Sequence, residues 1–246
     1  MFDELISEAL KQDFSGWDFS WLDGRWQEND PTWDYSQLVK EKIVGIDSLL
    51  DMDTGGGEFM ASLGKLPPNT SATESYPPNI IVARQRLEPL GVNVVTPEND
   101  KTLPFPDNSF DLIINRHGAF WSPEIYRILK PGGTFITQQV GESNLIQINQ
   151  SLQDEVKLEY GDWTLKRAIN ELENAGLQIT RQQEEFPDSI FYDIGAVVFY
   201  LKVIQWQIED FTVDKYRQRL LSLHNQIQKD GQFAGKSHRF YVEARK

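Results

Sequence analysis

The chain has 246 residues and a formal net charge of −13, with 39% hydrophobic and 12% aromatic residues. This composition provides a core for one large domain, or a domain with appendages, and excludes a wholly disordered chain. Non-specific binding to nucleic acid depends on clustered Lys and Arg, so the negative charge argues against a nucleic-acid partner. The absence of cysteine excludes disulfides and thiolate metal sites, and we expect no bound metal.

No stretch of the sequence is typical of a targeting or membrane segment. The first residues are acidic and lack the basic and then apolar order of a secretory signal. The longest apolar stretch, around residues 194–208, is interrupted by Lys202 and is too short to span a membrane. We therefore expect a cytoplasmic protein with no membrane partner.

The first 40 residues are predicted to form an N-terminal extension. Apolar residues at helical spacing predict a helix over residues 1–12. The polar segment 13–35 then carries four tryptophans, at positions 17, 21, 26 and 33. Either these indoles fasten a flap onto the core, or they form a lid over a ligand. In the second interpretation Trp33 and Tyr35 are candidate acceptor contacts.

Next comes a helix over residues 36–43, with Ser36 as a candidate N-cap, and a strand over residues 48–52. Three consecutive glycines, Gly55, Gly56 and Gly57, separate this strand from a helix predicted over residues 58–63. Glycine adopts positive φ and lets a ligand approach the backbone closely. The carboxyl end of such a strand is where open α/β sheets bind nucleotides, so the pattern predicts a nucleotide-like cofactor site.

The remaining predicted elements alternate between strand and helix. We expect strands over residues 92–95, 110–115, 134–140, 177–183 and 240–244, and helices over 79–90, 121–129, 163–175, 196–208 and 214–229. This alternation predicts an α/β fold with a doubly wound, mostly parallel sheet and helices on both faces. We assign residues 41–246 to this domain, with an insertion at about 190–235.

The glycine turn matches neither common phosphate-binding pattern. A dinucleotide site needs G-x-G-x-x-G, and the third glycine is missing, which argues against a nicotinamide-dependent oxidoreductase. No Walker-type Gly-Lys-Ser/Thr is present either. Carboxylates at Asp51, Glu74 and Asp100 are spaced to meet the hydroxyl and amino groups of a cofactor without phosphates. Glu74 follows Gly57 by 17 residues, close to the spacing of about 20 at which an acidic residue meets ribose.

Three segments together resemble the class I S-adenosylmethionine-dependent methyltransferases. They are residues 50–57, 103–114 and 128–133, in the order of that family's motifs, and they cover about residues 45–141. The resemblance implies a seven-stranded sheet whose last, antiparallel strand is residues 240–244. It also implies S-adenosylmethionine as the cofactor.

The resemblance assigns roles to the matching positions. Gly55 and Gly57 are expected to line the methionine part of the cofactor, and Glu74 to hold the ribose hydroxyls. Asn99 or Asp100 is expected at the adenine amino group, and Asn115 at the floor of the pocket.

Asp53 departs from the family pattern, which usually has glycine at that position. Asp tolerates left-handed backbone angles, so the turn is expected to survive. Its carboxylate either attracts the cofactor's positive charge or narrows the pocket. We expect Asp53 to weaken binding without abolishing it.

Methyl transfer needs an aligned acceptor more than a catalytic residue. His117, after the fourth strand, is the candidate base or acceptor contact, with a structural role as the alternative. Arg116 is a candidate contact for an acidic group on the acceptor. The signature Asn-Pro-Pro-Tyr/Phe is missing there, which disfavours adenine or glutamine amides as acceptors. We read His224 and His238 as surface residues.

These observations predict methyl transfer to a small or medium-sized acceptor. The alternative is a non-catalytic cofactor-binding or scaffold protein that retains the fold. The oligomeric state is left open.

Overall fold

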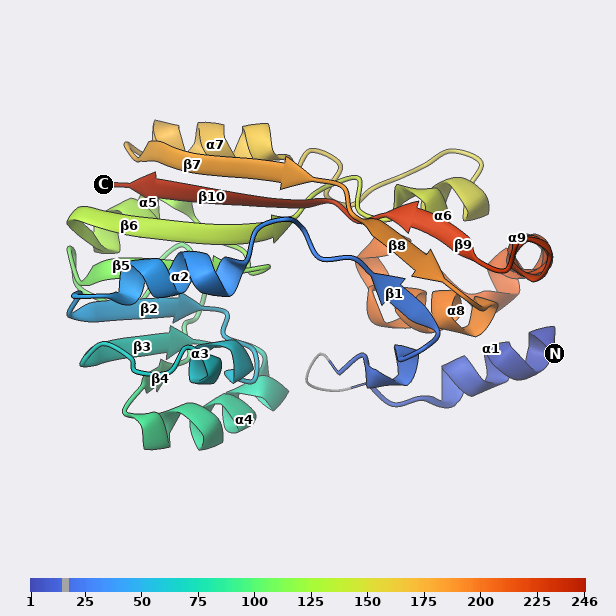
Figure 1. Cartoon of the computed structure of the whole chain (residues 1–246), viewed down its shortest axis with the longest axis horizontal. Coiled ribbons are helices and arrows are strands. Elements are labelled where there is room, and N and C mark those ends of the chain that lie inside the picture. Colours follow the sequence, from blue (N-terminus) through green and yellow to red (C-terminus); the bar gives the residue numbers. More distant parts are fainter. Residues whose placement is uncertain (15–17) are drawn as a thin grey trace. The chain divides into compact units, whose positions relative to one another are not determined.

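The computed structural model describes residues 1–14 and 18–246 (Figure 1). The chain divides into two compact units, each assembled from three segments. Unit 1 comprises Met1–Pro31, Gly141–Trp163 and Glu185–Arg239, and unit 2 comprises Thr32–Val140, Thr164–Glu184 and Phe240–Lys246. These boundaries differ from the expected ones at residue 40 and at 190–235. Trp17 lies outside the described residues.

Unit 2 is built on the predicted seven-stranded sheet, with strand order β4-β3-β2-β5-β6-β10-β7. Its strands are β2 (Ser48–Met52), β3 (Asn69–Thr73), β4 (Asn93–Val95), β5 (Phe110–Arg116), β6 (Leu129–Val140), β7 (Gln178–Glu185) and β10 (Arg239–Arg245). The pairs β2–β3, β2–β5, β3–β4 and β5–β6 are parallel. Figure 1 shows β10 running opposite to its neighbours, as the resemblance implies for the last strand.

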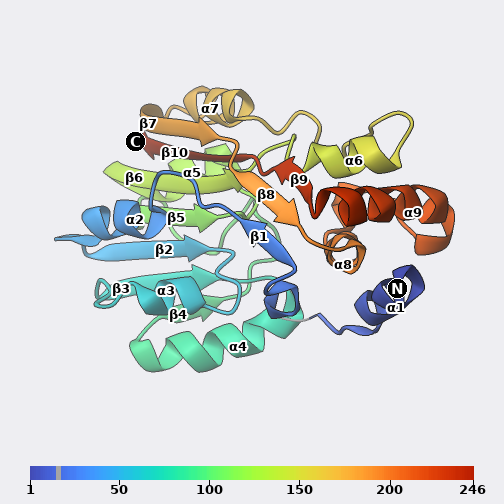
Figure 2. The ribbon, with the colours of Figure 1, turned by 45° about the vertical axis from the view of Figure 1, so that its right-hand side comes forward.

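Helices cover both faces of this sheet, as expected. They are α2 (Tyr35–Ile43), α3 (Glu58–Ser62), α4 (Pro77–Leu87), the 3-10 helix η2 (Glu88–Leu90), α5 (Ser122–Ile128) and α7 (Leu165–Asn174). Figures 1 and 2 show α2 on one face and α5 on the other. One core cluster lies between the sheet and helices α2, α3 and α4, and it includes Leu49, Ile114 and Ile136.

The N-cap of α2 differs from the prediction. The Asp34 carboxylate accepts a hydrogen bond from the Gln37 backbone N–H at 3.1 Å, and the helix begins at Tyr35, so Ser36 lies inside the first turn. Asp and Ser are both good N-caps, and sequence alone does not separate candidates two residues apart.

Unit 1 contains a small antiparallel sheet that was not predicted. Its strands β1 (Trp26–Glu28), β8 (Asp188–Phe191) and β9 (Phe233–Lys236) are ordered β1-β8-β9. Its helices are α1 (Phe2–Lys11), α6 (Ile146–Leu152), α8 (Ile194–Val203) and α9 (Val213–Asp230), with 3-10 turns η1 (Ser20–Leu22) and η3 (Gln205–Gln207). Helix α8 is the centre of this unit's core, with eight of its residues buried.

Two tryptophans of the N-terminal segment belong to the core of unit 1. Trp21 packs on Phe199 with ring centroids 4.9 Å apart. The Trp26 indole N–H donates to the Ser189 hydroxyl at 2.8 Å. These contacts favour the flap interpretation for both residues.

The expectation that His224 and His238 lie on the surface is wrong. His224 lies on the inner face of α9, where Leu220 and Ile227 are also buried, and its ring contacts Phe2. His238 is buried, and its Nδ1 atom lies 2.9 Å from the Ser143 hydroxyl. An imidazole has an apolar body, and the spacing of His224 from its apolar neighbours on α9 is that of one helix face.

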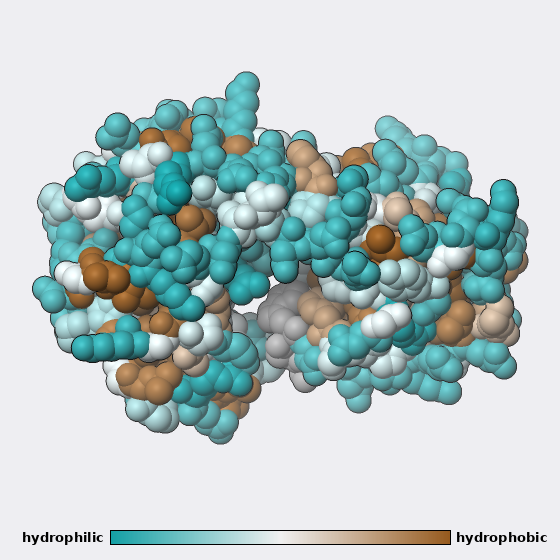
Figure 3. Space-filling view, in the orientation of Figure 1, coloured by the Kyte–Doolittle hydropathy of each residue, from teal (hydrophilic) through white to brown (hydrophobic). Residues whose placement is uncertain are grey.

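The described residues contain no helix that is both long and apolar enough to cross a membrane. The face of the molecule drawn in Figure 3 is mainly hydrophilic, with scattered hydrophobic side chains. This surface agrees with the charged composition of the chain.

Candidate functional site

The strands of unit 2 bring the predicted site residues to one edge of the sheet. Asp51 pairs with Ala72 across β2 and β3, and Met52 pairs with Asn115 across β2 and β5. Because these strands are parallel, their carboxyl ends meet at the same edge. Glu74 follows β3 directly, so it lies beside the glycine turn as predicted.

The glycine turn is open at Gly55. This residue has φ +64°, and a Cβ atom built there would meet no atom within 4 Å. The turn is held by backbone hydrogen bonds, since Thr54 N–H donates to the Thr73 carbonyl at 2.9 Å. The main chain at Gly55, which is half-buried, therefore has open space beside its Cα atom.

Gly57, unlike Gly55, is packed against a neighbouring side chain. It has φ +80° and caps α3, and a Cβ atom there would lie 2.7 Å from Cγ of Leu87 on α4. Its Cα thus faces the neighbouring helix, and glycine is required for that close approach. Of the two glycines predicted to line the cofactor, Gly55 has the open side.

Two of the predicted carboxylates are buried. Asp51 accepts a hydrogen bond from the Thr54 hydroxyl at 2.7 Å, and burial raises its pKa to about 7. Glu74 accepts from the Tyr76 backbone N–H at 2.7 Å, while its other oxygen lies 3.5 Å from the Asn79 amide. The short hydrogen bond from Tyr76 thus orients the Glu74 carboxylate, whose oxygens can accept further hydrogen bonds.

The structure distinguishes Asn99 from Asp100. The Asn99 side chain accepts hydrogen bonds from the backbone N–H groups of Lys101 and Thr102, so it closes its own turn. Asp100 is half-buried, and burial raises its pKa. Its charge also raises the pKa of Asp53, so Asp100 is the one of the two that faces the other carboxylates.

Asp53 occupies the turn with a left-handed backbone, φ +55°. Burial is the main cause that raises its pKa to about 7, followed by the charges of Asp100, Glu74 and Asp51. The turn survives without glycine at this position, as expected for Asp.

Asn115 is fully buried at the end of β5. Its side-chain oxygen Oδ1 accepts hydrogen bonds from the Thr137 hydroxyl at 2.9 Å and from the Gln139 amide at 2.7 Å. Within residues 1–14 and 18–246, its Nδ2 atom has no hydrogen-bond partner. A Cβ atom built on Gly118 would lie 2.7 Å from this nitrogen and 2.5 Å from Oδ2 of Asp53. The role of Gly118 was not predicted, because it depends on how closely the loop after β5 approaches the turn after β2.

His117 and Arg116 are exposed at the same edge. His117 has φ +65°, and its Nε2 atom lies 3.1 Å from the Gln138 amide nitrogen. An amide nitrogen only donates, so His117 accepts this bond through Nε2. The Arg116 guanidinium lies 5.4 Å from the centre of the Phe59 ring.

Trp33 and Tyr35 are part of the core of unit 2. The Trp33 indole N–H donates to Oε1 of Gln138 at 2.7 Å, which orients the amide that contacts His117. The Tyr35 hydroxyl donates to the carbonyl of Asn115 at 3.0 Å. Both residues are buried, so the flap interpretation describes them better than a lid. Their hydrogen bonds hold Gln138 and the backbone of Asn115 in place.

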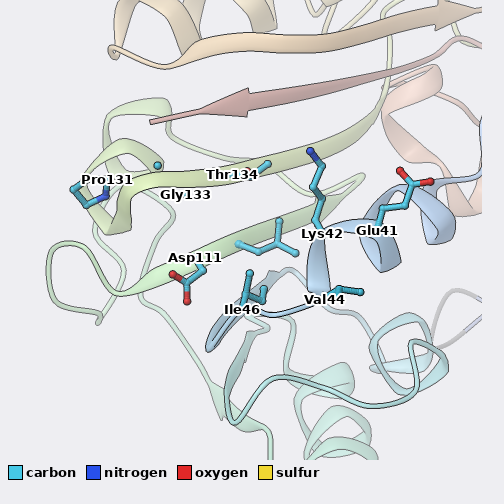
Figure 4. Close-up of a pocket in the computed structure, with 10 residues that line it drawn as sticks. Glu41, Lys42, Val44, Ile46, Asp111, Pro131, Gly133 and Thr134 are labelled. Carbon is cyan, nitrogen blue, oxygen red and sulfur yellow. The ribbon is translucent and has the colours of Figure 1, made fainter.

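A groove of about 330 Å³ lies at the opposite edge of this sheet (Figure 4). It is lined by residues at the amino ends of β5 and β6, including Asp111 and Thr134, and by Lys42 of α2. Lys42 is paired with Glu243, and Asp111 with Lys130. Asp111 and Asn115 are four residues apart on one strand, or about 13 Å at 3.3 Å per residue, so this groove is separate from the glycine turn.

Comparisons with known proteins agree with this geometry. Residues 50–137 match the model of a family described as the methyltransferase domain. The chain is 26% identical over 140 residues to a malonyl-(acyl-carrier protein) O-methyltransferase of Marinomonas sp. (strain MWYL1), covering 51% of this chain and 52% of that protein. It is 30% identical over 113 residues to the biotin biosynthesis bifunctional protein BioHC of Teredinibacter turnerae, covering 42% of this chain and 20% of that protein.

The fold comparison extends further along the chain. A solved structure described as a putative methyltransferase from Bacillus halodurans superposes with a TM-score of 0.61 at 18% identity, covering 86% of this chain and 98% of that one. The matching segment contains the turn and the strand ends described above. Residues 50–137 therefore resemble a methyltransferase domain, and most of the chain shares the fold of that solved structure. The chain spans about half the length of the first of its two curated relatives and a fifth of the second.

S-adenosylmethionine is the methyl donor of this family, and the site fits it. The open side of Gly55 would let a ligand approach the main chain closely. Glu74 and Asp100 provide acceptors for hydroxyl and amino groups, and the buried Nδ2 atom of Asn115 is a donor without a partner in the described chain. The site's carboxylates suit a cofactor that carries a positive sulfonium.

Proposed function

We propose that the protein transfers a methyl group from S-adenosylmethionine to a small or medium-sized acceptor. The observation that carries the proposal is the open Gly55 turn with the Glu74 carboxylate at the end of the adjacent parallel strand. When bound, the cofactor would supply an electrophilic methyl group on its sulfonium. The residues of the chain then need only hold the cofactor and align the acceptor, since alignment supplies much of the rate of such reactions.

We assign Glu74 to the ribose hydroxyls and Gly55 to the methionine part. Asp100 is the better candidate for the adenine amino group because Asn99 is engaged in its own turn. Asp51, which is buried beneath the turn, holds the Thr54 hydroxyl and so supports the bend.

His117 and Arg116 remain the candidates for the acceptor side, because both are exposed at the cofactor edge. The Gln138 amide donates to Nε2 of His117 and so holds the ring at this edge. We propose that His117 orients the acceptor and that Arg116 attracts an acidic group on it.

The acceptor is proposed to be a small molecule. The first curated relative is named for methylation of a malonyl group on a carrier protein, which makes a carboxylate a reasonable first acceptor class to assay. The net charge of −13 disfavours nucleic acid, and we propose a cytoplasmic location.

Titration calorimetry with S-adenosylmethionine tests the cofactor assignment. We expect binding by the wild type and affinity lower by about ten- to hundredfold in Glu74→Gln, because hydrogen bonds to a charged group contribute about 1.5–3 kcal/mol. Glu98→Gln is the matched control: it removes one exposed charge at the same edge and should bind normally. Equal affinities of all three proteins would contradict the role of Glu74.

The alternative is a non-catalytic protein that binds the cofactor, and Asp53 in the turn is the observation that favours it. Label from methyl-tritiated S-adenosylmethionine, incubated with the protein and a cell extract, separates the two. Transfer of label into small molecules supports the enzyme. Binding without transfer across extracts and carboxylate acceptors would favour the alternative. Calorimetry on Asp53→Gly completes the test, because no binding by either protein removes the cofactor assignment.

A further inference from the structure

We propose that Asp53 makes this site selective for the cationic methyl donor over its neutral product, S-adenosylhomocysteine. The inference rests on the proposed function. In methyl transfer the acceptor's lone pair forms the new bond to carbon, and the electrons of the broken bond remain on sulfur. The positive charge passes to the acceptor, which loses it with a proton if it carries one. Sulfur is therefore charged before the reaction and neutral afterwards.

The Asp53 carboxylate lies where its interaction with a bound ligand would depend on the charge of the ligand. Asp53 lies in the turn between Asp51 and the open Gly55, and its own backbone is left-handed, φ +55°. Its Oδ2 atom lies beside the Cα of Gly118, since a Cβ atom there would be only 2.5 Å away. The carboxylate is thus directed from the turn after β2 toward the loop after β5.

A second observation marks the same point as a ligand site. The fully buried Nδ2 atom of Asn115 faces the same Gly118, 2.7 Å from the Cβ position, and has no partner among residues 1–14 and 18–246. An unpaired buried donor is costly unless a ligand satisfies it. A zwitterionic ligand, with a carboxylate for Asn115 and a positive charge for Asp53, matches both groups.

The charges around Asp53 favour an organic cation. The carboxylates of Asp100, Glu74 and Asp51 all act on it. Arg116 is exposed, and its charge lowers the pKa of Asp51. In the part of the chain that the structure describes, no three acidic or histidine side chains are grouped as a metal site would require. A cationic ligand would therefore relieve the repulsion among these carboxylates, and a neutral one would not.

The same charges make the selectivity depend on pH. The pKa of Asp53 is raised to about 7, chiefly by burial and then by the three neighbouring carboxylates. Below that pH the group is protonated and carries no charge, so preference for a cation weakens. Above it, the ionised carboxylate is available for the cation.

The test compares two stable probes that share the adenosine and amino-acid parts. Sinefungin carries an amine, cationic near neutral pH, in place of the sulfonium, and S-adenosylhomocysteine is neutral at that position. Calorimetry at pH 6 and 8 gives the affinity ratio of sinefungin to S-adenosylhomocysteine. We expect the wild-type ratio to be higher at pH 8 and to fall by about tenfold or more in Asp53→Asn. Asn also tolerates left-handed angles, so the variant keeps the turn.

Controls separate the possible results. Glu98→Gln loses an exposed charge and should keep the wild-type ratio at both pH values. If Asp53→Asn weakens both probes equally, Asp53 contacts the shared amino-acid part and the inference is overturned. A ratio that is unchanged in the variant, with intact circular dichroism, also overturns it. Failure of both probes to bind the wild type instead removes the proposed function.

Discussion

At the residue scale, the site depends on how closely the loop after β5 approaches the turn after β2. Gly118 is the point of contact, because Oδ2 of Asp53 and Nδ2 of Asn115 both lie where its Cβ would be. Neither the length nor the composition of this loop identifies Gly118, and sequence patterns gave it no role. The glycine turn was predictable because three consecutive glycines after an apolar strand have few other uses.

Gly118→Ala is expected to destabilise the fold by about 1–3 kcal/mol, because an inserted methyl group must displace the buried Asn115 side chain and the half-buried Asp53 carboxylate. Urea denaturation measures the change. Gly161→Ala is the control, since its Cβ would make ordinary contacts at 3.4 Å. Equal free energies of unfolding for Gly118→Ala and the wild type would show that the loop moves freely.

At the element scale, strands were easier to predict than their caps and partners. β2 and β5 are apolar runs that are nearly buried throughout, and both were found within one residue of their ends. β3 (Asn69–Thr73) has a poor strand composition, but it pairs with β2 on one side and β4 on the other. Tertiary pairing therefore overrides its propensity. The strands of unit 1 were missed because each has only three or four residues and pairs with a segment distant in sequence.

The cap of α2 provides a direct test at this scale. Asp34→Ala removes the acceptor for the Gln37 N–H and should lower the free energy of unfolding by about 0.5–2 kcal/mol. Ser36→Ala, at the position that the sequence pattern favoured, should change it by a few tenths at most. Urea denaturation of the two variants decides between them, and a larger loss for Ser36→Ala would contradict the observed helix start.

At the scale of the whole molecule, the carboxylates of Asp51 and Asp53 lower the free energy of unfolding when they are ionised. Asp51 and Asp53 have pKa values of about 7 in the folded protein, against a reference value of 3.8. A raised folded pKa means that the native state binds more protons than the unfolded state between these two values. The contribution of each group to stability therefore falls as pH rises from about 4 to about 7, and stays low above that.

Replacing Asp53 with Asn removes one of these groups. We expect Asp53→Asn to gain about 3–4 kcal/mol of stability relative to the wild type as pH rises from 4 to 8, because each unit of pKa corresponds to about 1.4 kcal/mol. The free energy of unfolding in urea, measured at both pH values, gives the difference. If the difference in the free energy of unfolding between the two proteins is the same at pH 4 and pH 8, burial and the neighbouring carboxylates do not raise the pKa of Asp53.

Sequence reasoning placed the carboxylates at the right strand ends because parallel strands share an edge. It left Asn99 and Asp100 unresolved, since that choice rests on a turn closed by the Asn99 side chain. The buried His224 and His238 show the same limit, because burial depends on packing partners from other segments. Sequence patterns do not identify the contacts between segments that are distant in the sequence.

The central claim is that bare main chain at Gly55 and the Glu74 carboxylate together hold an adenosine-bearing methyl donor. A crystal structure of the protein grown with S-adenosylhomocysteine measures this directly. We expect ligand density against Gly55, with the ribose hydroxyls about 2.5–3.0 Å from the Glu74 carboxylate. Density elsewhere in the molecule, or none at saturating ligand, would contradict it.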